Sequence, residues 1–157
     1  MERYRAADLT YDDITQDIEF ETASRTITEG DVMMFAGLTG DFNELHTSAS
    51  YAEHTAFGAR IAHGMLTLAI ANGLYMRLNL FEKNTVANLG IESWSFKKAV
   101  KIGDTLHVTL RLSDKRLTRD PRRGIIRWNV DVLNQENELV ANGIWVKMFL
   151  TRMAANY

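Results

Sequence analysis

The chain has 157 residues, of which 46% are hydrophobic and 24% are charged, with 18 basic and 20 acidic side chains. This balance is typical of an ordinary globular protein, and we expect a single domain over residues 1–157. The absence of cysteine excludes disulfides, thiolate metal sites and cysteine nucleophiles. A net charge of -2 argues against general nucleic-acid binding, which needs a positive field.

The first residues contain no apolar run typical of a signal peptide, and three of the first five are charged. We therefore expect a cytoplasmic protein. The longest apolar stretch, residues 61–80, is long enough to cross a bilayer but contains His63, Asn72 and Arg77. It is expected to form a helix inside the protein, and no membrane partner is expected.

In chain order, the first expected element is a strand over residues 18–25, where apolar and small side chains alternate with charged ones. Thr28 is then expected to cap a helix, because its hydroxyl can accept a hydrogen bond from the N–H of Asp31. Either Gly37 or Gly40 would end this helix, since glycine commonly terminates helices.

Residues 38–60 show no clear period beyond a short helix expected near 50–54. Such a long irregular stretch within a compact domain is often functional. The next segment, residues 62–78, is apolar or small on nearly every side, which predicts a buried helix through the middle of the fold.

The remainder of the chain alternates in the manner of strands. Four strands are expected, over residues 89–97, 105–113, 125–133 and 139–150. A bulge is expected near Ser93, where the apolar side chains change face. Antiparallel strands around one buried helix predict an α+β fold. Both faces of the last strand are apolar, which favours a partner subunit in a homodimer or a dimer of dimers.

The irregular stretch contains an acid and a base five residues apart, Asp41 and His46, on a segment whose glycines allow sharp turns. Gly64 stands close to the start of the buried helix, where a backbone N–H can bind a negative charge. A carboxylate, an imidazole and a helix-start amide can bind a water molecule, move its protons and stabilise an oxyanion.

Other roles for these residues are also open. Asp41 and Asn43 can form a turn by bonding to their own backbone, and an isolated histidine such as His46 is commonly a surface residue. His54 and His107 are expected to be solvated. The residue pattern around Asp41 does not fit a calcium loop, and the histidine spacings match no common zinc site.

Residues 35–46 and 61–65 together resemble the signature of the MaoC-like dehydratases and (R)-specific enoyl-CoA hydratases, which have the hotdog fold. The positions in agreement are Gly40, Asp41, Asn43, Leu45, His46, Ala52, Ala62, His63, Gly64 and Met65. Glu44 departs from the pattern, because the family usually has proline there. The resemblance implies an antiparallel sheet wrapped around a long central helix.

The resemblance also implies reversible addition of water to a trans-2-enoyl-CoA, giving an (R)-3-hydroxyacyl-CoA. Asp41 and His46 would activate the water, and the Gly64 N–H would bind the thioester oxygen. Asn43 would orient the loop or a catalytic partner. No metal and no redox cofactor are expected, and coenzyme A enters only as part of the substrate.

Helical spacing of about 100° per residue places Leu68, Ala71, Asn72 and Tyr75 on roughly the same face as Gly64. These residues are therefore expected to line the path of the acyl chain beyond the thioester. Because Tyr75 is bulky, we expect a preference for short acyl chains.

Further substrate contacts are expected at Met65 and at His63, which could instead serve only to hold the loop at the helix entry. The basic turn at residues 115–123 is a candidate for binding the phosphates of coenzyme A through Arg122 and Arg123. It could equally be a solvated hairpin tip.

Two other functions fit the same features. One is an acyl-CoA thioesterase of the hotdog fold, in which water attacks the carbonyl carbon. The other is a protein that binds acyl-CoA or lipid without catalysis.

Overall fold

The computed structural model describes residues 8–155. Its helical elements are η1 (Tyr11–Asp13), α1 (Glu29–Thr39), α2 (Glu44–Thr47), α3 (Ala49–Glu53), α4 (Gly64–Met76) and α5 (Arg152–Ala155). Its strands are β1 (Glu19–Glu21), β2 (Arg25–Thr26), β3 (Thr85–Phe96), β4 (Thr105–Leu117), β5 (Arg123–Leu133) and β6 (Leu139–Leu150). The expected α+β class is confirmed.

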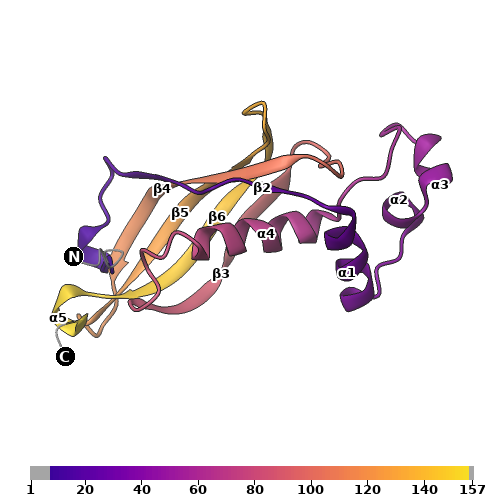
Figure 1. The fold of residues 1–157 in the computed structure, drawn as a ribbon. Coiled ribbons are helices and arrows are strands. Elements are labelled where there is room, and N and C mark those ends of the chain that lie inside the picture. Colours follow the sequence, from indigo (N-terminus) through magenta and orange to yellow (C-terminus); the bar gives the residue numbers. More distant parts are fainter. Residues whose placement is uncertain (1–7, 156–157) are drawn as a thin grey trace, which may run out of the picture.

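The strands form one antiparallel sheet in the order β1-β4-β5-β6-β3, and β2 pairs with β4 beyond the end of β1. Short connections join β4 to β5 and β5 to β6, whereas β3 precedes them in the chain yet pairs with β6. The long strands curve around α4, which lies against one face of the sheet (Figure 1). The order leaves β3 as an edge strand.

Helix α4 supplies the centre of the core, as its apolar composition predicts. Leu66, Ile70 and Leu74 are all buried on the side of α4 that meets the sheet. The sheet contributes large buried side chains, including Trp128 and Phe149. Burying several such side chains stabilises the packing of helix on sheet by about 2 kcal/mol each.

The first strand and the central helix differ from expectation at their ends. The strand expected at residues 18–25 is divided, because after β1 the Thr22 hydroxyl accepts a hydrogen bond from the Val108 N–H at 2.9 Å. Helix α4 begins at Gly64 because Ala62 is still extended and donates its N–H to the Val100 carbonyl at 2.7 Å.

The later strands are longer than expected. Strand β3 begins at Thr85, and the expected bulge is confirmed by a register shift between Ile91 and Ser93. Strand β4 has a register shift between Leu112 and Asp114 and continues to Leu117. The hairpin tip is therefore shorter than expected and comprises residues 118–122. A bulge changes the alternation of faces, and periodicity alone therefore ends the strand too early.

Helices α1, α2 and α3 lie together beyond the start of α4, while η1, α5 and the β4–β5 hairpin tip lie at the opposite end of the sheet (Figure 1). Within residues 8–155, no helix combines the length and apolar character that crossing a membrane requires.

Several apolar side chains of β3 and α1 remain exposed. Val86, Leu89 and Ile91 of β3 are more than 40% exposed, and Met34 and Leu38 of α1 are 69% and 84% exposed. By contrast, the outer face of β6, from which a partner subunit was expected, is half-buried. Strand β3 and helix α1 therefore each contribute exposed apolar surface.

Candidate active site

Helix α1 lies directly before the candidate site in the chain. Its N-terminus has the expected cap: the Thr28 hydroxyl accepts from the Asp31 N–H, and the Asp31 carboxylate accepts from the Thr28 N–H at 2.8 Å. Its C-terminus is Gly40, which has a φ of +80° that favours glycine, and its N–H bonds to the Ala36 carbonyl at 2.8 Å. The helix therefore ends immediately before Asp41.

Asn43 links Asp41 to the next helix. Its backbone N–H donates to the Asp41 carboxylate at 3.3 Å, and its side-chain oxygen caps α2 by accepting from the Leu45 N–H at 2.9 Å. The Asn43 carbonyl also accepts from the His46 N–H at 2.9 Å. The expected turn is therefore present, and it is the start of a four-residue helix that carries His46.

The ring of His46 is oriented by the chain that leads into α4. Its Nδ1 lies 2.8 Å from the carbonyl oxygen of Ile61. Because a carbonyl oxygen can only accept, Nδ1 donates in this hydrogen bond. In the neutral ring the proton is then on Nδ1, and Nε2 carries a free lone pair.

His63 is buried at the entrance to α4, with only 2% of its surface exposed. Its Nε2 donates to the Asp41 backbone carbonyl at 3.0 Å, which ties the loop to the helix start. Its ring centroid lies 3.9 Å from that of His46 and 5.0 Å from that of Phe35. Its Nδ1 is buried without a hydrogen-bond partner among the described residues.

The three polar side chains converge. One ligand-type atom from each of Asp41, His46 and His63 lies within 4.8 Å of the other two, although Asp41 is exposed. This spacing suits a bound water molecule. The two imidazole planes are tilted by 31° to one another. The same spacing also allows the three side chains to hold a metal ion.

Gly64 is the first residue of α4, and the first N–H groups of a helix have no partner within the helix. A side chain at this position would collide with Phe96, because an added Cβ would come within 2.7 Å of its ring. A larger residue here would therefore displace the half-exposed ring of Phe96. Together with the helix dipole, the free amides favour a partly negative oxygen next to Gly64.

A cavity of about 440 Å³ lies beside this cluster, between α4 and the strands β3 and β6. Its near end is formed by Phe35, which contacts His63, and by Met65. The residues that line the rest are Leu68, Ala69, Asn72, Asn88, Leu89, Gly90, Ile91, Trp145, Val146 and Lys147. Of the residues expected to contact the substrate, the structure places Met65, Leu68 and Asn72 here.

Tyr75 and Ala71 do not line this cavity, contrary to expectation. Both are almost fully buried in the core, and the Tyr75 ring stacks on Phe81 at a centroid distance of 5.4 Å. Burial raises the pKa of the Tyr75 hydroxyl. The face that α4 presents to the sheet lies next to the face that lines the cavity, and helical spacing alone does not separate two such neighbouring faces.

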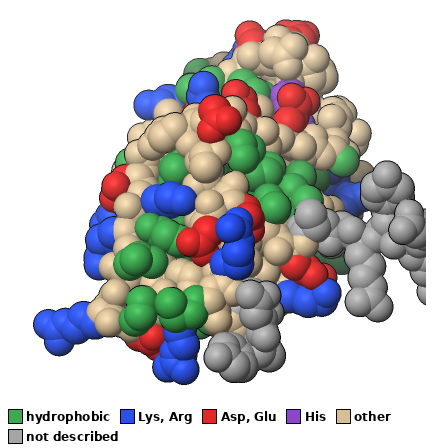
Figure 2. Space-filling model, turned by 90° about the vertical axis from the view of Figure 1, so that its left-hand side faces the viewer, with side chains coloured by type: hydrophobic (Ala, Val, Ile, Leu, Met, Phe, Trp, Pro, Cys, Tyr) green, Lys and Arg blue, Asp and Glu red, His purple; other side chains and the backbone are tan. Residues whose placement is uncertain are grey.

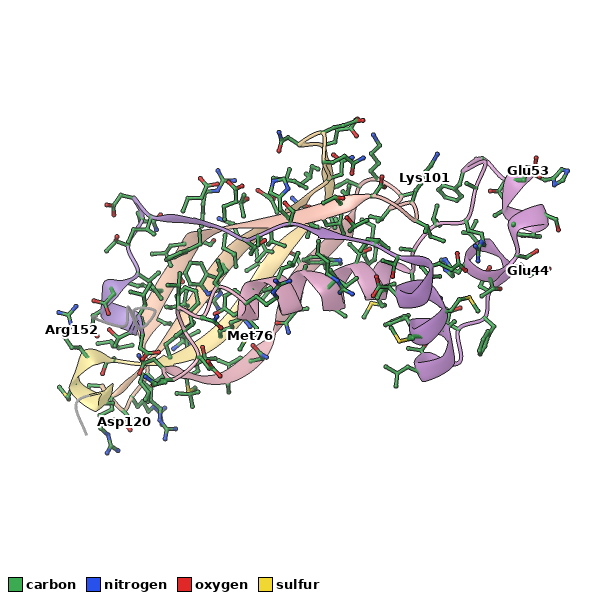
Figure 3. The ribbon with its side chains drawn as sticks, viewed as in Figure 1. Glu44, Glu53, Met76, Lys101, Asp120 and Arg152 are labelled. Atoms are coloured by element: carbon green, nitrogen blue, oxygen red, sulfur yellow. The ribbon has the colours of Figure 1, made fainter. Side chains whose placement is uncertain are left out.

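The basic hairpin tip is also distant from the site. Asp120 lies at the end of the molecule opposite to Glu44 of α2 (Figure 3). Arg122 forms an ion pair with Asp120 at 3.0 Å, and Arg123 opens β5 beside it. The end of the molecule that carries this tip shows positive and negative side chains interspersed (Figure 2). Within one chain, the structure therefore does not bring Arg122 and Arg123 to the candidate site.

The sequence interpretation gave no site role to Phe35, Asn88 or Lys147. Phe35 contacts His63 on one side and lines the cavity on the other. Lys147 is a charged residue at an inward position of an apolar strand. That conflict between charge and burial was a signal in the sequence, because lysine is rarely buried without a role.

Comparison with known proteins identifies the family. Residues 13–133 match the sequence profile described as MaoC like domain. The chain belongs to this family. The MaoC-like domain of this protein is 37% identical over 90 residues to the (R)-specific enoyl-CoA hydratase of Rhodospirillum rubrum. The match covers 57% of this chain and 60% of the relative, so the chain spans less than two thirds of that curated protein.

Solved structures agree with this assignment. The R-hydratase PhaJ1 from Pseudomonas aeruginosa is 30% identical and superposes with a TM-score of 0.75, covering 92% of this chain and 88% of that one. A Mycobacterium tuberculosis protein described as having a double hotdog fold has a TM-score of 0.79 at 18% identity, covering 91% of this chain and 44% of that one. The hotdog fold expected from the resemblance is confirmed.

Proposed function

We propose that this MaoC-like domain catalyses the reversible addition of water to a trans-2-enoyl-CoA thioester, giving an (R)-3-hydroxyacyl-CoA. The observation that carries the proposal is the convergence of the Asp41 carboxylate and the two imidazoles of His46 and His63 within 4.8 Å, beside the start of α4. The relatives named as hydratases support the reaction class.

The reaction needs a base for the water that attacks C3 and an acid that protonates C2. The His46 Nε2 carries the free lone pair, since Nδ1 is held by the Ile61 carbonyl. His46 therefore removes a proton from the water, while the Asp41 carboxylate accepts the second water hydrogen and holds the molecule. The proton is then returned to C2 on the same face of the double bond, which gives syn addition.

Charge develops on the thioester oxygen as C3 is attacked. The N–H of Gly64 donates to this oxygen, assisted by the dipole of α4. Removal of one such donor typically lowers kcat by about 100- to 1,000-fold. His63 positions the loop by donating to the Asp41 carbonyl, and its second nitrogen, Nδ1, is available to the substrate. Asn43 positions Asp41 and His46 through its backbone and side chain.

An assay with crotonyl-CoA distinguishes hydration from thioester hydrolysis and from binding without catalysis. Hydration removes the conjugated enoyl absorbance without releasing free thiol, whereas a thioesterase releases thiol. Asp41→Asn and His46→Ala should each lower kcat by about 100- to 10,000-fold, the range for loss of a general acid or base, with the fold preserved.

His54→Ala is the matched control, because His54 is the exposed residue directly after α3, and its ring bonds to the Ser50 carbonyl rather than to the candidate site. It should keep the wild-type rate. Chiral analysis of the product should give the (R) alcohol. Binding of acyl-CoA without turnover, or thiol release at the hydration rate, would contradict the proposal.

We further propose that the protein is a homodimer joined at the β3 edge. Strand β3 pairs with β6 on one side and has no partner strand on its other side within residues 8–155. Its exposed apolar side chains, Val86, Leu89 and Ile91, would be covered by the same strand of a second copy. Leu89 and Ile91 also line the cavity, so a partner here would close it.

A further inference from the structure

Lys147 is a buried charge that the proposed hydration does not use. It stands on β6 between Trp145 and Phe149, which are among the large side chains of the core, and only 2% of its surface is exposed. Lysine is rarely buried to this degree without a partner for its charge. The group that interacts with this buried charge is therefore relevant to the function of the protein.

The described part of the chain supplies no carboxylate to Lys147. Its Nζ donates to the Asn88 side-chain oxygen at 2.5 Å, which satisfies one of its three hydrogens. It also lies 4.3 Å from the Tyr75 ring centroid and 5.5 Å from that of Trp145. Aromatic faces stabilise a cation but do not neutralise it. The buried ammonium group thus lacks a counter-ion among residues 8–155.

Lys147 lies at the far end of the cavity from the candidate catalytic cluster. Strand β3 runs antiparallel to α4: Phe96 packs at Gly64, at the start of the helix, while Asn88 pairs in register with Lys147, next to Tyr75 near its end. The cavity therefore runs from Phe35, which contacts His63, to Lys147.

Two amides accompany Lys147 at this end of the cavity. Asn88 accepts from its Nζ, and Asn72 of α4 lines the same end. No hydrogen bond joins the Asn72 amide to another described residue, so its N–H groups are available to a ligand. An ammonium and a free amide at the end of an otherwise apolar cavity are suited to a carboxylate.

We propose that the acyl group of the substrate carries a carboxylate at the end remote from the thioester, and that Lys147 binds this carboxylate with Asn72 beside it. This inference rests on the proposed function, because the hydration chemistry places the thioester at Gly64. Lys147 is then a specificity residue for acyl thioesters with an ω-carboxyl group.

The length of α4 sets the size of this acyl group. From Gly64 to Asn72 the helix rises about 12 Å, which an extended chain of about eight to ten carbons spans. The expectation of short acyl chains rested on Tyr75, and Tyr75 lies behind Lys147 rather than in the cavity. The best substrate is therefore of medium length with a terminal carboxylate.

The first test uses the wild-type protein and matched pairs of substrates. Each trans-2-enoyl-CoA of four to ten carbons is compared with its ω-carboxy counterpart. We expect kcat/KM to favour the ω-carboxy substrate by about 10- to 100-fold at the best length, the usual effect of a charged hydrogen bond. Equal kcat/KM values, or a preference for the unsubstituted chain at every length, would overturn the inference.

The second test assigns the preference to Lys147. In Lys147→Met, the preference for the ω-carboxy substrate should disappear, because KM for that substrate rises relative to KM for the unsubstituted chain of equal length. Lys147→Arg should restore part of the preference. Lys83→Met is the matched control, because Lys83 is exposed on the surface and should leave the preference unchanged.

A binding assay distinguishes this inference from the hydration itself. Saturated ω-carboxyacyl-CoA and acyl-CoA of equal length cannot be hydrated, and calorimetry measures their affinities directly. If no enoyl-CoA is turned over but the carboxylated ligand binds about 10-fold tighter through Lys147, the proposed function fails and the carboxylate site stands. If hydration occurs and the two ligands bind equally well, the carboxylate site fails and the function stands.

Discussion

Individual residues at the helix ends set the geometry of the candidate site. Gly40 ends α1 with a positive φ, Asn43 begins α2 with its side chain, and His63 begins α4 while bonding to the Asp41 carbonyl. The bonds of Gly40 and Asn43 satisfy backbone groups that the helix ends would otherwise leave unpaired. The bond of His63 orients the loop next to the start of α4. Asp41 and His46 are therefore held in place by hydrogen bonds, although Asp41 is exposed and His46 is half-buried.

Asn43→Ala tests this positioning role. Loss of the cap should lower the free energy of unfolding by about 1 kcal/mol. It should lower kcat by about 10- to 100-fold with a smaller effect on KM, because small displacements of catalytic groups slow the chemical step. Steady-state kinetics with crotonyl-CoA and urea unfolding are the measurements.

Ser48→Ala is the matched variant, because Ser48 caps α3 by the same type of bond to the Tyr51 N–H, and α3 carries no candidate catalytic residue. It should cost similar stability and leave kcat unchanged. Equal effects of the two variants on kcat would show that Asn43 has only a structural role.

At the scale of elements, α4 and β3 define the substrate path between them. Helix α4 presents one face to the core and a neighbouring face to the cavity, while β3 contributes Asn88, Leu89, Gly90 and Ile91 to the opposite wall. Strand β3 is also an edge strand with an unpaired outer side in the described chain. The same element thus lines the cavity and offers the surface at which a second copy would pair.

Val86→Glu tests pairing at the β3 edge without altering the cavity, which Val86 does not line. Two chains of 17.9 kDa should elute together as a dimer, and a charge buried at the edge should shift the mass to that of one chain. Light scattering after size-exclusion chromatography measures the mass.

Leu117→Glu is the control, because Leu117 is similarly exposed at the end of β4 but far from the β3 edge. This variant should remain dimeric. A monomeric wild-type protein, or a dimer that Val86→Glu leaves intact, would contradict pairing through β3.

For the whole molecule, the buried Lys147 makes stability depend on pH. Desolvation lowers the pKa of Lys147 to about 8, below its ordinary value of 10.5. Below pH 8 the lysine is protonated in both the folded and the unfolded chain, and the full cost of burying its charge is present. Between pH 8 and 10.5 the unfolded chain binds more protons than the folded one. The destabilisation caused by burying Lys147 therefore decreases as the pH rises.

Lys147→Met should remove this dependence. At pH 7 the free energy of unfolding of the variant should exceed that of the wild type by up to about 3 kcal/mol. The loss of the contacts to Asn88 and the aromatic rings reduces this gain. The difference between the two proteins should shrink as the pH approaches 10.5. Urea unfolding from pH 7 to 10.5 measures it, and a constant difference, or a less stable variant at every pH, would show that Lys147 carries no desolvation penalty.

The fold was predictable to a large extent because its signals are local and periodic. The cap of α1 at Thr28, the buried character of α4 and the bulge near Ser93 were expected and are confirmed. Of the two glycines expected to end α1, Gly37 and Gly40, the structure has Gly40. Strand and helix ends were less predictable, because partners distant in sequence decide them. Thr22 divides the first strand through its bond to Val108, for example.

The candidate site was partly predictable for the same reason. Asp41, Asn43 and His46 lie within six residues, so loop geometry alone could bring them near one another. The contacts of His46 with Ile61 and of Asp41 with His63 join segments that are 15 and 22 residues apart. These contacts form only when the two segments pack together, so the sequence alone does not predict them. The catalytic roles of these residues and the cytoplasmic location stay predictions.

The amino-acid sequence by itself determined the α+β class, the family resemblance and the candidate acid, base and helix-start amide, because those features depend on residue type and short spacing. Only the tertiary structure decided that Tyr75 belongs to the core, that Arg122 and Arg123 lie at the far end, and that Lys147 closes the cavity. These outcomes depend on which faces of α4 and β6 meet, and burial is a property of packed elements rather than of a single segment.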